Sequence, residues 1–235
     1  MPKKKIIDHY HHGDLKVSLI KTALKMLETQ SPIALSLREL AKKAGVSQSA
    51  PYRHFKDKDE LINAICTEAF EIKLKLMQEA MIEAKGDPLQ TYFGCGISYF
   101  RMGLKHPQHF KLMFSELCSP DESHPELQRV AATTFALVRE MVLIAQKGGV
   151  IGPGDPYHIA MNCWCVVNGY TVLYANGKMD WLGVTPENAE SGLKILLQQM
   201  LVGLNKGFGK TSQHFKLFKT PESSPHLEMM NQILF

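Results

Sequence analysis

The residues best suited to chemistry lie between positions 36 and 58, where short polar side chains alternate with basic and aromatic ones. Amides and guanidinium groups pair with the edges of bases, and cations and hydroxyls contact phosphate oxygens. The segment therefore predicts binding to double-stranded DNA rather than catalysis. The residues expected to contact DNA are Ser36, Arg38, Ser47, Gln48, Ser49, Ala50, Pro51, Tyr52, Arg53, His54, Lys56 and Lys58.

Three of these residues are suited to reading bases. The amide of Gln48 can form two hydrogen bonds with adenine, and the hydroxyl of Ser49 can donate or accept one. The methyl group of Ala50 can contact the methyl group of thymine. Several base sequences satisfy these side chains, so the operator sequence stays open.

The residues expected to contact phosphates are Tyr52, His54, Lys56 and Lys58. Their hydroxyl, imidazole and ammonium groups would give position and salt-dependent affinity rather than sequence choice. Arg53 is suited to either role. Phe55 is expected to pack inside a small helical bundle, and packing is also the alternative for Tyr52.

These side chains need two short helices at a fixed angle, and the pattern from 36 to 55 predicts such a pair. Ser36 can cap a first helix, with Glu39 completing a capping box. Gly45 supplies the tight turn, Val46 fills the angle between the helices, and Ser47 caps a second helix. The start of that second helix would enter the major groove. The inward stripe of the first helix is Leu37, Leu40, Ala41 and Ala44.

The stretch AGVSQSAPYRHF, followed by a lysine-containing loop, resembles the helix-turn-helix of the tetracycline-repressor (TetR) family. The resemblance extends upstream to a YHHGDL opening at residues 10–15, found in the branch whose C-terminal domain is called WHG. Proline at position 51 is usual there, although it forfeits a helical hydrogen bond. Residues 164–169, WCVVNG, are similar to the W-x-x-x-H-G signature of that branch, with Asn168 in place of a titratable histidine.

The resemblance implies a homodimer built by the last two long helices. Two recognition helices would then read a pseudo-palindromic operator, with half-sites about 34 to 36 Å apart or a multiple of that distance. The last two long helices each carry a broad apolar face, and packing within one chain is the alternative explanation of these faces. The expected interface residues are Val166, Tyr170, Leu193, Leu197, Met200, Leu201 and Leu204.

Aromatic residues and methionines are concentrated between residues 87 and 114, beyond what one core stripe needs. They predict a pocket for a small apolar or aromatic effector, which would release a repressor from DNA. Plain helix packing is the alternative, and an activator is a further possibility. The expected lining is Phe93, Tyr99, Phe100, Met102, Phe110, Met113, Phe114, Trp164 and Asn168.

An enzyme is disfavoured, because we find no nucleophile elbow, phosphate loop, metal motif or usefully spaced pair of carboxylates. No cofactor and no metal are expected. A redox-responsive regulator is the other alternative, but Cys163 and Cys165 point about 200° apart on a helix and cannot bridge readily within it.

Composition agrees with a two-domain protein that binds nucleic acid at one end. Residues 1–60 carry twelve lysines and arginines against seven acidic residues, whereas the rest of the 235-residue chain is nearly neutral. No run approaches the roughly 18 apolar residues that a membrane span needs, and the unpaired cysteine pattern favours the cytoplasm.

Helical periodicity without strand alternation predicts an all-α fold of about nine helices. We expect a helix-turn-helix domain of three helices over 12–72, a helical effector and dimerisation domain over 85–206, and an extension over 207–235. Lys3, Lys4 and Lys5 would form an arm near phosphates, and His11 and His12 a polar entry to the first helix. The expected helices are 15–30, 37–44, 48–55, 59–84, 88–105, 107–114, 125–147, 156–176 and 186–205.

Overall fold

The computed structural model describes residues 12–205, which form eight α-helices and three single-turn 3-10 helices with no strand among them. The lysine arm, His11 and the extension over 207–235 lie outside the described residues. The α-helices are α1 (His12–Met26), α2 (Leu37–Ala44), α3 (Lys58–Glu83), α4 (Pro88–Lys105), α5 (Pro107–Met113), α6 (Pro125–Lys147), α7 (Pro156–Ala175) and α8 (Ala189–Asn205); the 3-10 helices are η1 (Pro32–Ala34), η2 (Pro51–Arg53) and η3 (Asp180–Leu182).

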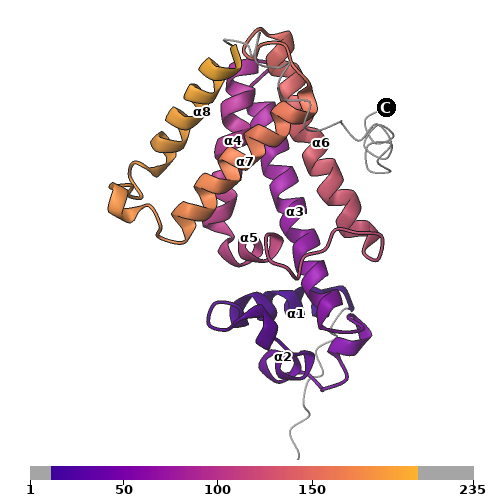
Figure 1. Ribbon diagram of the computed structural model, residues 1–235. Coiled ribbons are helices and arrows are strands. Elements are labelled where there is room, and N and C mark those ends of the chain that lie inside the picture. The colour runs from indigo at the N-terminus through magenta and orange to yellow at the C-terminus, as the bar shows by residue number, and fades with distance from the viewer. Residues whose placement is uncertain (1–11, 206–235) are drawn as a thin grey trace, which may run out of the picture.

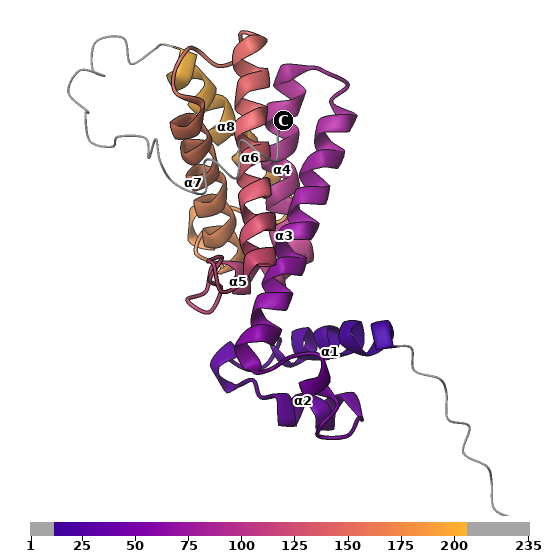
Figure 2. The ribbon, with the colours of Figure 1, turned by 90° about the vertical axis from the view of Figure 1, so that its right-hand side faces the viewer.

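The molecule has a small head and a larger helical body, joined by one long helix (Figures 1 and 2). The head holds α1, α2 and the start of α3, and the body holds α4 to α8 around the rest of α3. With 26 residues, α3 is about 40 Å long. It runs without interruption through the region between 72 and 83, as the expected helix over 59–84 implies, so the two expected domains share a helix.

Side-chain caps fix the starts of α2, α3, α4 and α7 close to where the sequence predicts them. The carboxylate of Asp87 accepts hydrogen bonds from the backbone N–H groups of residues 89 and 90, and Asp155 caps α7 in the same way. The last helix was expected to begin at residue 186, and that start is wrong. There the side chain of Asn188 accepts from the Thr185 N–H and holds a turn, so α8 begins at Ala189.

Two hydrophobic cores are present. The upper core lies among α3, α4, α5, α6, α7 and α8, and the lower core fills the head. Leu112 from α5 and Leu127 from α6 belong to the lower core and are almost fully buried. The head is therefore packed directly against two helices of the body, and a shift of the body can reach it.

Candidate nucleic-acid interface and effector cavity

The first half of the helix-turn-helix forms as the sequence predicts. The hydroxyl of Ser36 accepts a hydrogen bond from the Glu39 N–H at 3.2 Å, which caps α2. Gly45 ends that helix at φ +69°, a left-handed conformation that favours glycine. The N–H of Val46 then bonds to the Ala41 carbonyl at 3.0 Å, which turns the chain sharply at the end of α2.

The predicted second helix is wrong in its geometry. Residues 48–50 form a turn, and residues 51–53 form a single 3-10 turn, η2, instead of a continuous α-helix over 48–55. Pro51 has no N–H to donate to the Ser47 carbonyl, so the helical ladder cannot start through it. The bonds of Ala50 to Ser47 and of His54 to Pro51 span three residues, the spacing of a 3-10 helix.

Most of the residues predicted to contact DNA are nevertheless presented to solvent. Tyr52 is 55% exposed although it is aromatic, which answers the alternative that it packs in the core. A shallow hollow of about 570 Å³ lies between α2 and residues 48–55, called the recognition segment below. It brings Ser36, Arg38 and Gln48 together. The exposed members of the predicted set are Ser36, Arg38, Ser47, Gln48, Ser49, Tyr52, Arg53 and Lys56.

Four predicted DNA contacts are placed differently. Ala50 and Pro51 are buried against the head, so their side chains anchor the segment and are withdrawn as DNA contacts. The Nε2 atom of His54 is buried without a hydrogen bond. The Lys58 ammonium donates to the Ile33 carbonyl at 3.1 Å, which ties η1 to the start of α3.

Lys42 was missed at this surface. It is exposed and lines the same hollow as Arg38, four residues earlier on α2. Residues four apart share one helix face, and this spacing was the signal that could have identified it.

A second candidate site lies inside the body, between α3, α4, α6 and α7. It is a small cavity of about 30 Å³, and Tyr99 and Trp164 from the predicted effector set line it. The Tyr99 hydroxyl donates a hydrogen bond to the Asn168 side-chain oxygen at 2.7 Å. The full lining is Lys73, Met77, Cys95, Gly96, Tyr99, Val138, Met141, Cys163, Trp164 and Val167.

The other residues of the predicted effector set surround this cavity or lie away from it. Phe110 packs edge-on against Tyr99, and Phe114 lies between Phe110 and Trp164. Phe100 packs instead against tyrosines of α7, and Met102 and Met113 belong to the hydrophobic core. None of these three residues lines the cavity.

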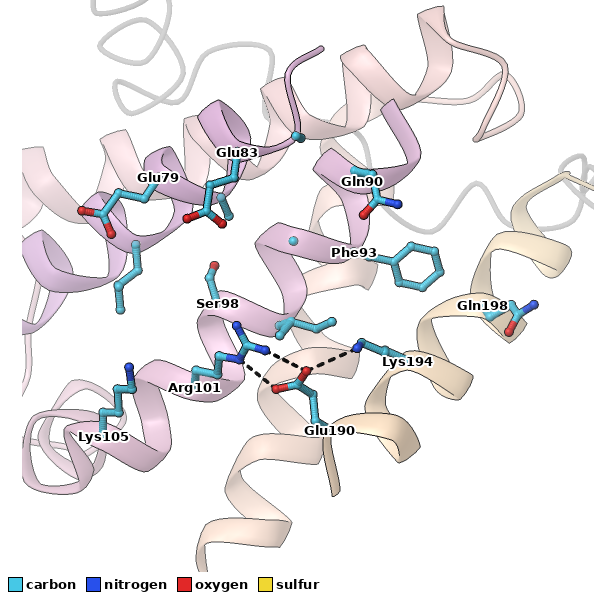
Figure 3. A pocket seen from close by; sticks show the side chains of 15 residues that line it. Glu79, Glu83, Gln90, Phe93, Ser98, Arg101, Lys105, Glu190, Lys194 and Gln198 are labelled. Atoms are coloured by element: carbon cyan, nitrogen blue, oxygen red, sulfur yellow. Dashed lines mark hydrogen bonds and ion pairs between the residues drawn. The ribbon is translucent and has the colours of Figure 1, made fainter. Parts of the chain in front are cut away.

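Phe93 lines a different feature, an open groove of about 950 Å³ between α3, α4 and α8 (Figure 3). Arg101 in this groove makes two hydrogen bonds of 2.8 Å to Glu190, and Lys194 reaches the same carboxylate at 3.3 Å (Figure 3). Glu79, Glu83 and Lys105 also line the groove, so its charged lining suits an apolar effector less well than the internal cavity does.

Lys73 was missed by the sequence prediction. It follows Ala69 and precedes Met77 by four residues each, so it lies on the buried stripe of α3 and is only 5% exposed. Burial lowers the pKa of its ammonium from 10.5 to about 7. The Nζ atom lies 4.5 Å from the centre of the Tyr99 ring and 6.0 Å from that of Trp164. A lysine within an apolar stripe was the available signal.

The apolar faces of α7 and α8 also differ from the prediction. Met200 is half-buried and Val166 is partly exposed, whereas the other five expected interface residues are turned into the core of their own chain. The Tyr170 hydroxyl, for example, donates to the Ala189 carbonyl at 2.6 Å. The five buried residues are Tyr170, Leu193, Leu197, Leu201 and Leu204.

The opposite faces of the same two helices carry exposed apolar side chains. Two of them lie on α7, twelve residues apart, and three lie on α8, where positions 195 and 202 are seven residues apart and share one side of the helix. These side chains are between 37% and 55% exposed: Met161, Leu173, Ile195, Leu196 and Val202.

Cys163 and Cys165 lie on opposite sides of α7, the first buried and the second exposed. A bond between them within the helix is therefore ruled out by direction. Across the described residues, no helix is long and apolar enough to cross a bilayer.

Comparison with known proteins identifies both parts of the chain. A family model for bacterial regulatory proteins of the tetR family matches residues 19–65, and a model for the tetracyclin repressor-like C-terminal domain matches residues 93–200. The uncharacterized HTH-type transcriptional regulator YerO of Bacillus subtilis is 25% identical over 144 residues. That match covers 59% of this chain and 49% of the length of YerO, so the chain spans about half of that relative.

Solved structures agree on the fold. A protein of unknown function from Rhodococcus sp. RHA1 has a TM-score of 0.73 and 28% identity, covering 84% of this chain and 99% of that one. Two more distant neighbours are similar in fold alone. The fatty acid degradation regulator FadR of Bacillus halodurans has a TM-score of 0.67 and 17% identity, covering 86% of this chain and 98% of its own. The TetR family regulator PfmR of Thermus thermophilus has a TM-score of 0.64 and 20% identity, covering 79% and 98%.

The capped α2, the glycine turn and the exposed recognition segment coincide with the first match, and the helices around the cavity coincide with the second. The chain therefore belongs to the TetR family of DNA-binding transcriptional regulators.

Proposed function

We propose that this protein is a homodimeric repressor that leaves its operator when a small molecule enters the cavity around Lys73. The DNA-binding part of the proposal rests on one observation: some side chains of the recognition segment are buried in the head and others are exposed. Ala50 and Pro51 anchor it in the head, while Gln48, Tyr52 and Arg53 project into solvent. Such a segment offers amide, hydroxyl and guanidinium groups to a groove without moving its backbone.

The exposed apolar side chains of α7 and α8 support the dimer. An added Cβ at Gly169 or Gly203 would meet no atom within 4 Å, so both glycines have open space beside them. Gly169 lies on α7 between Met161 and Leu173 in the sequence, and its missing side chain lets a partner helix approach. Apolar patches of this kind mark association surfaces, and a two-fold copy would complete a four-helix bundle.

Helix α3 links the effector cavity to the head in this proposal. Lys73 and Asn63 lie on it ten residues apart, about 15 Å along its axis. The Asn63 amide lies 2.7 Å from the His124 ring at the start of α6, and the Glu68 carboxylate lies 3.6 Å from the Nε2 atom of His109 on α5. A ligand that displaces α3 against α5 and α6 would change the spacing of the two heads in the dimer.

Binding-site selection from random DNA, followed by gel-shift titration in about 0.1 M salt, tests the proposal. We expect a pseudo-palindrome. Gln48→Ala should relax the choice at one base of each half-site and lose about 1 to 3 kcal/mol of discrimination. The control is Gln78→Ala, an exposed glutamine on α3 remote from the head. Unchanged binding in Gln48→Ala and Tyr52→Ala would remove the recognition segment from the interface.

A further inference from the structure

Lys73 lacks a counter-ion in the structure. Its ammonium forms no hydrogen bond and no ion pair with any residue of the described chain, 12–205, and its contacts are the faces of Phe70, Tyr99 and Trp164. Buried charges in proteins are usually paired, because an unpaired one is strongly disfavoured. A lysine kept here destabilises the unliganded fold, which points to a use in the liganded state.

The polar groups beside Lys73 are also donors. The Trp164 indole N–H is buried and forms no well-aligned hydrogen bond, although it lies beside the Tyr99 hydroxyl, and indole can only donate. The Tyr99 hydroxyl donates its one proton to the side-chain oxygen of Asn168. The cavity therefore holds an ammonium and an indole N–H that have no anionic partner among the described residues, and the acceptors beside them, the oxygens of Tyr99 and Asn168, are neutral.

The rest of the lining is apolar and includes Met77, Val138 and Met141. Methionine side chains adapt their shape to a ligand at small cost. One cation balances one negative charge, so a singly charged carboxylate fits better than a phosphate dianion. A cationic ligand would meet like charge, and a neutral one would leave the ammonium unpaired.

We propose that the effector of this regulator is an amphipathic monocarboxylic acid, with its carboxylate on Lys73 and Trp164 and its aliphatic or aromatic body against the methionines of α3 and α6. The effector role rests on the proposed function, but the binding of the acid can be measured without DNA.

The size of the cavity suggests how binding would be transmitted. A volume of about 30 Å³ holds little more than a water molecule. An acid with an apolar body must push α3 away from α4, α6 or α7 to enter. The movement would begin at Lys73 and Met77, on the helix whose other end builds the head.

Binding should also take up a proton above neutral pH, because a bound carboxylate favours the charged form of Lys73. The other titratable groups in the lining are Cys95 and Tyr99 on α4 and Cys163 on α7; α6 contributes none. Burial raises the pKa of both cysteines to about 12 and that of the tyrosine further, so all three stay neutral between about pH 6 and 9.

Fluorescence of Trp164 provides a direct test. The chain has two tryptophans, and Trp181 is 81% exposed, so the full-length Trp181→Phe variant leaves Trp164 as the reporter. We would titrate this protein with sodium octanoate and sodium benzoate, and with octanamide and benzamide as neutral matches. Calorimetry at about pH 8 in buffers of different ionisation enthalpy would measure the proton uptake.

At least one acid should saturate the signal and bind at least about tenfold more tightly than its amide, with uptake of close to one proton at pH 8. Lys73→Met should abolish the preference for the acid. Lys75→Met, which removes an exposed lysine two residues away, should keep it. Equal binding of acid and amide, an unchanged preference in Lys73→Met, or saturation by neither acid would overturn the proposal.

Gel shifts on the same samples separate the two proposals. An acid that saturates Trp164 without releasing DNA would confirm the acid site and refute its role as an effector. DNA binding by a protein that takes up neither acid would leave the regulator standing and remove the acid site.

Discussion

Replacing Lys73 with methionine should make the unliganded protein more stable, and by an amount that depends on pH. Burial of Lys73 in an apolar site destabilises the folded protein, and methionine fills a similar volume without charge. The pKa of the ammonium falls from 10.5 in the unfolded chain to about 7 in the folded one. Between these values the unfolded state binds more protons, so the stability of the wild type rises with pH.

The size of the effect follows from the shift. Each pKa unit corresponds to about 1.36 kcal/mol. The shifted pKa of Lys73 should therefore lower the free energy of unfolding of the wild type by about 4 kcal/mol at pH 7, by about 3 kcal/mol at pH 8.5 and by almost nothing above pH 10.5. Lys73→Met lacks this contribution. Below pH 7 the difference between the two proteins should level off, because the lysine is then charged in both states.

Urea unfolding at one fixed protomer concentration, repeated at about pH 6.5, 7.5 and 8.5, measures the difference. Lys75→Met serves as the control, because that lysine is exposed and its ion pair with Glu79, at 4.0 Å, is weak. A Lys73→Met protein less stable than the wild type would refute the reasoning. So would a difference that stays constant across this pH range.

Three further changes test the dimer and the helix-turn-helix. Leu173→Glu should convert the dimer to a monomer in sedimentation velocity and weaken operator binding, whereas Ile82→Glu, at a position 76% exposed on α3, should leave the dimer intact. A Leu173→Glu dimer would argue that another face associates. Ser36→Ala should lower the free energy of unfolding by about 1 kcal/mol through loss of the cap on α2. An unchanged free energy of unfolding would show that water replaces the serine hydroxyl at this N–H. Gly45→Ala should cost about 1 to 2 kcal/mol from backbone conformation alone, since a Cβ there meets no atom within 4 Å. An unchanged thermal midpoint for Gly45→Ala would contradict the left-handed turn.

Local signals in the sequence determined the helices and the family. Caps such as Ser36 and Asp87, the left-handed glycine at 45 and the apolar spacing of each helix act within a few residues, so they can be seen in one sequence. The prediction for the recognition segment failed in part for a local reason as well. Pro51 interrupts the helical hydrogen bonds, but the prediction followed the resemblance to the TetR motif instead of this signal.

Tertiary packing decided which face of each helix is inside. Helices α7 and α8 are apolar on more than one side, so periodicity could not tell Leu193 and Leu197, which fill the core, from Ile195 and Leu196, which lie outside. The difference depends on contacts with α4, far away in the sequence. Sequence periodicity has no access to such contacts.

The surroundings of Lys73 were decided in the same way. One sequence shows a lysine among the hydrophobic residues of α3, but lysine on a helix is usually solvated. Only the convergence of α3, α4, α6 and α7 makes the environment of this side chain apolar and leaves it without a carboxylate partner among the described residues. The sequence thus determined a helical DNA-binding regulator, and the packing of four distant helices determined the charge that its cavity presents to a ligand.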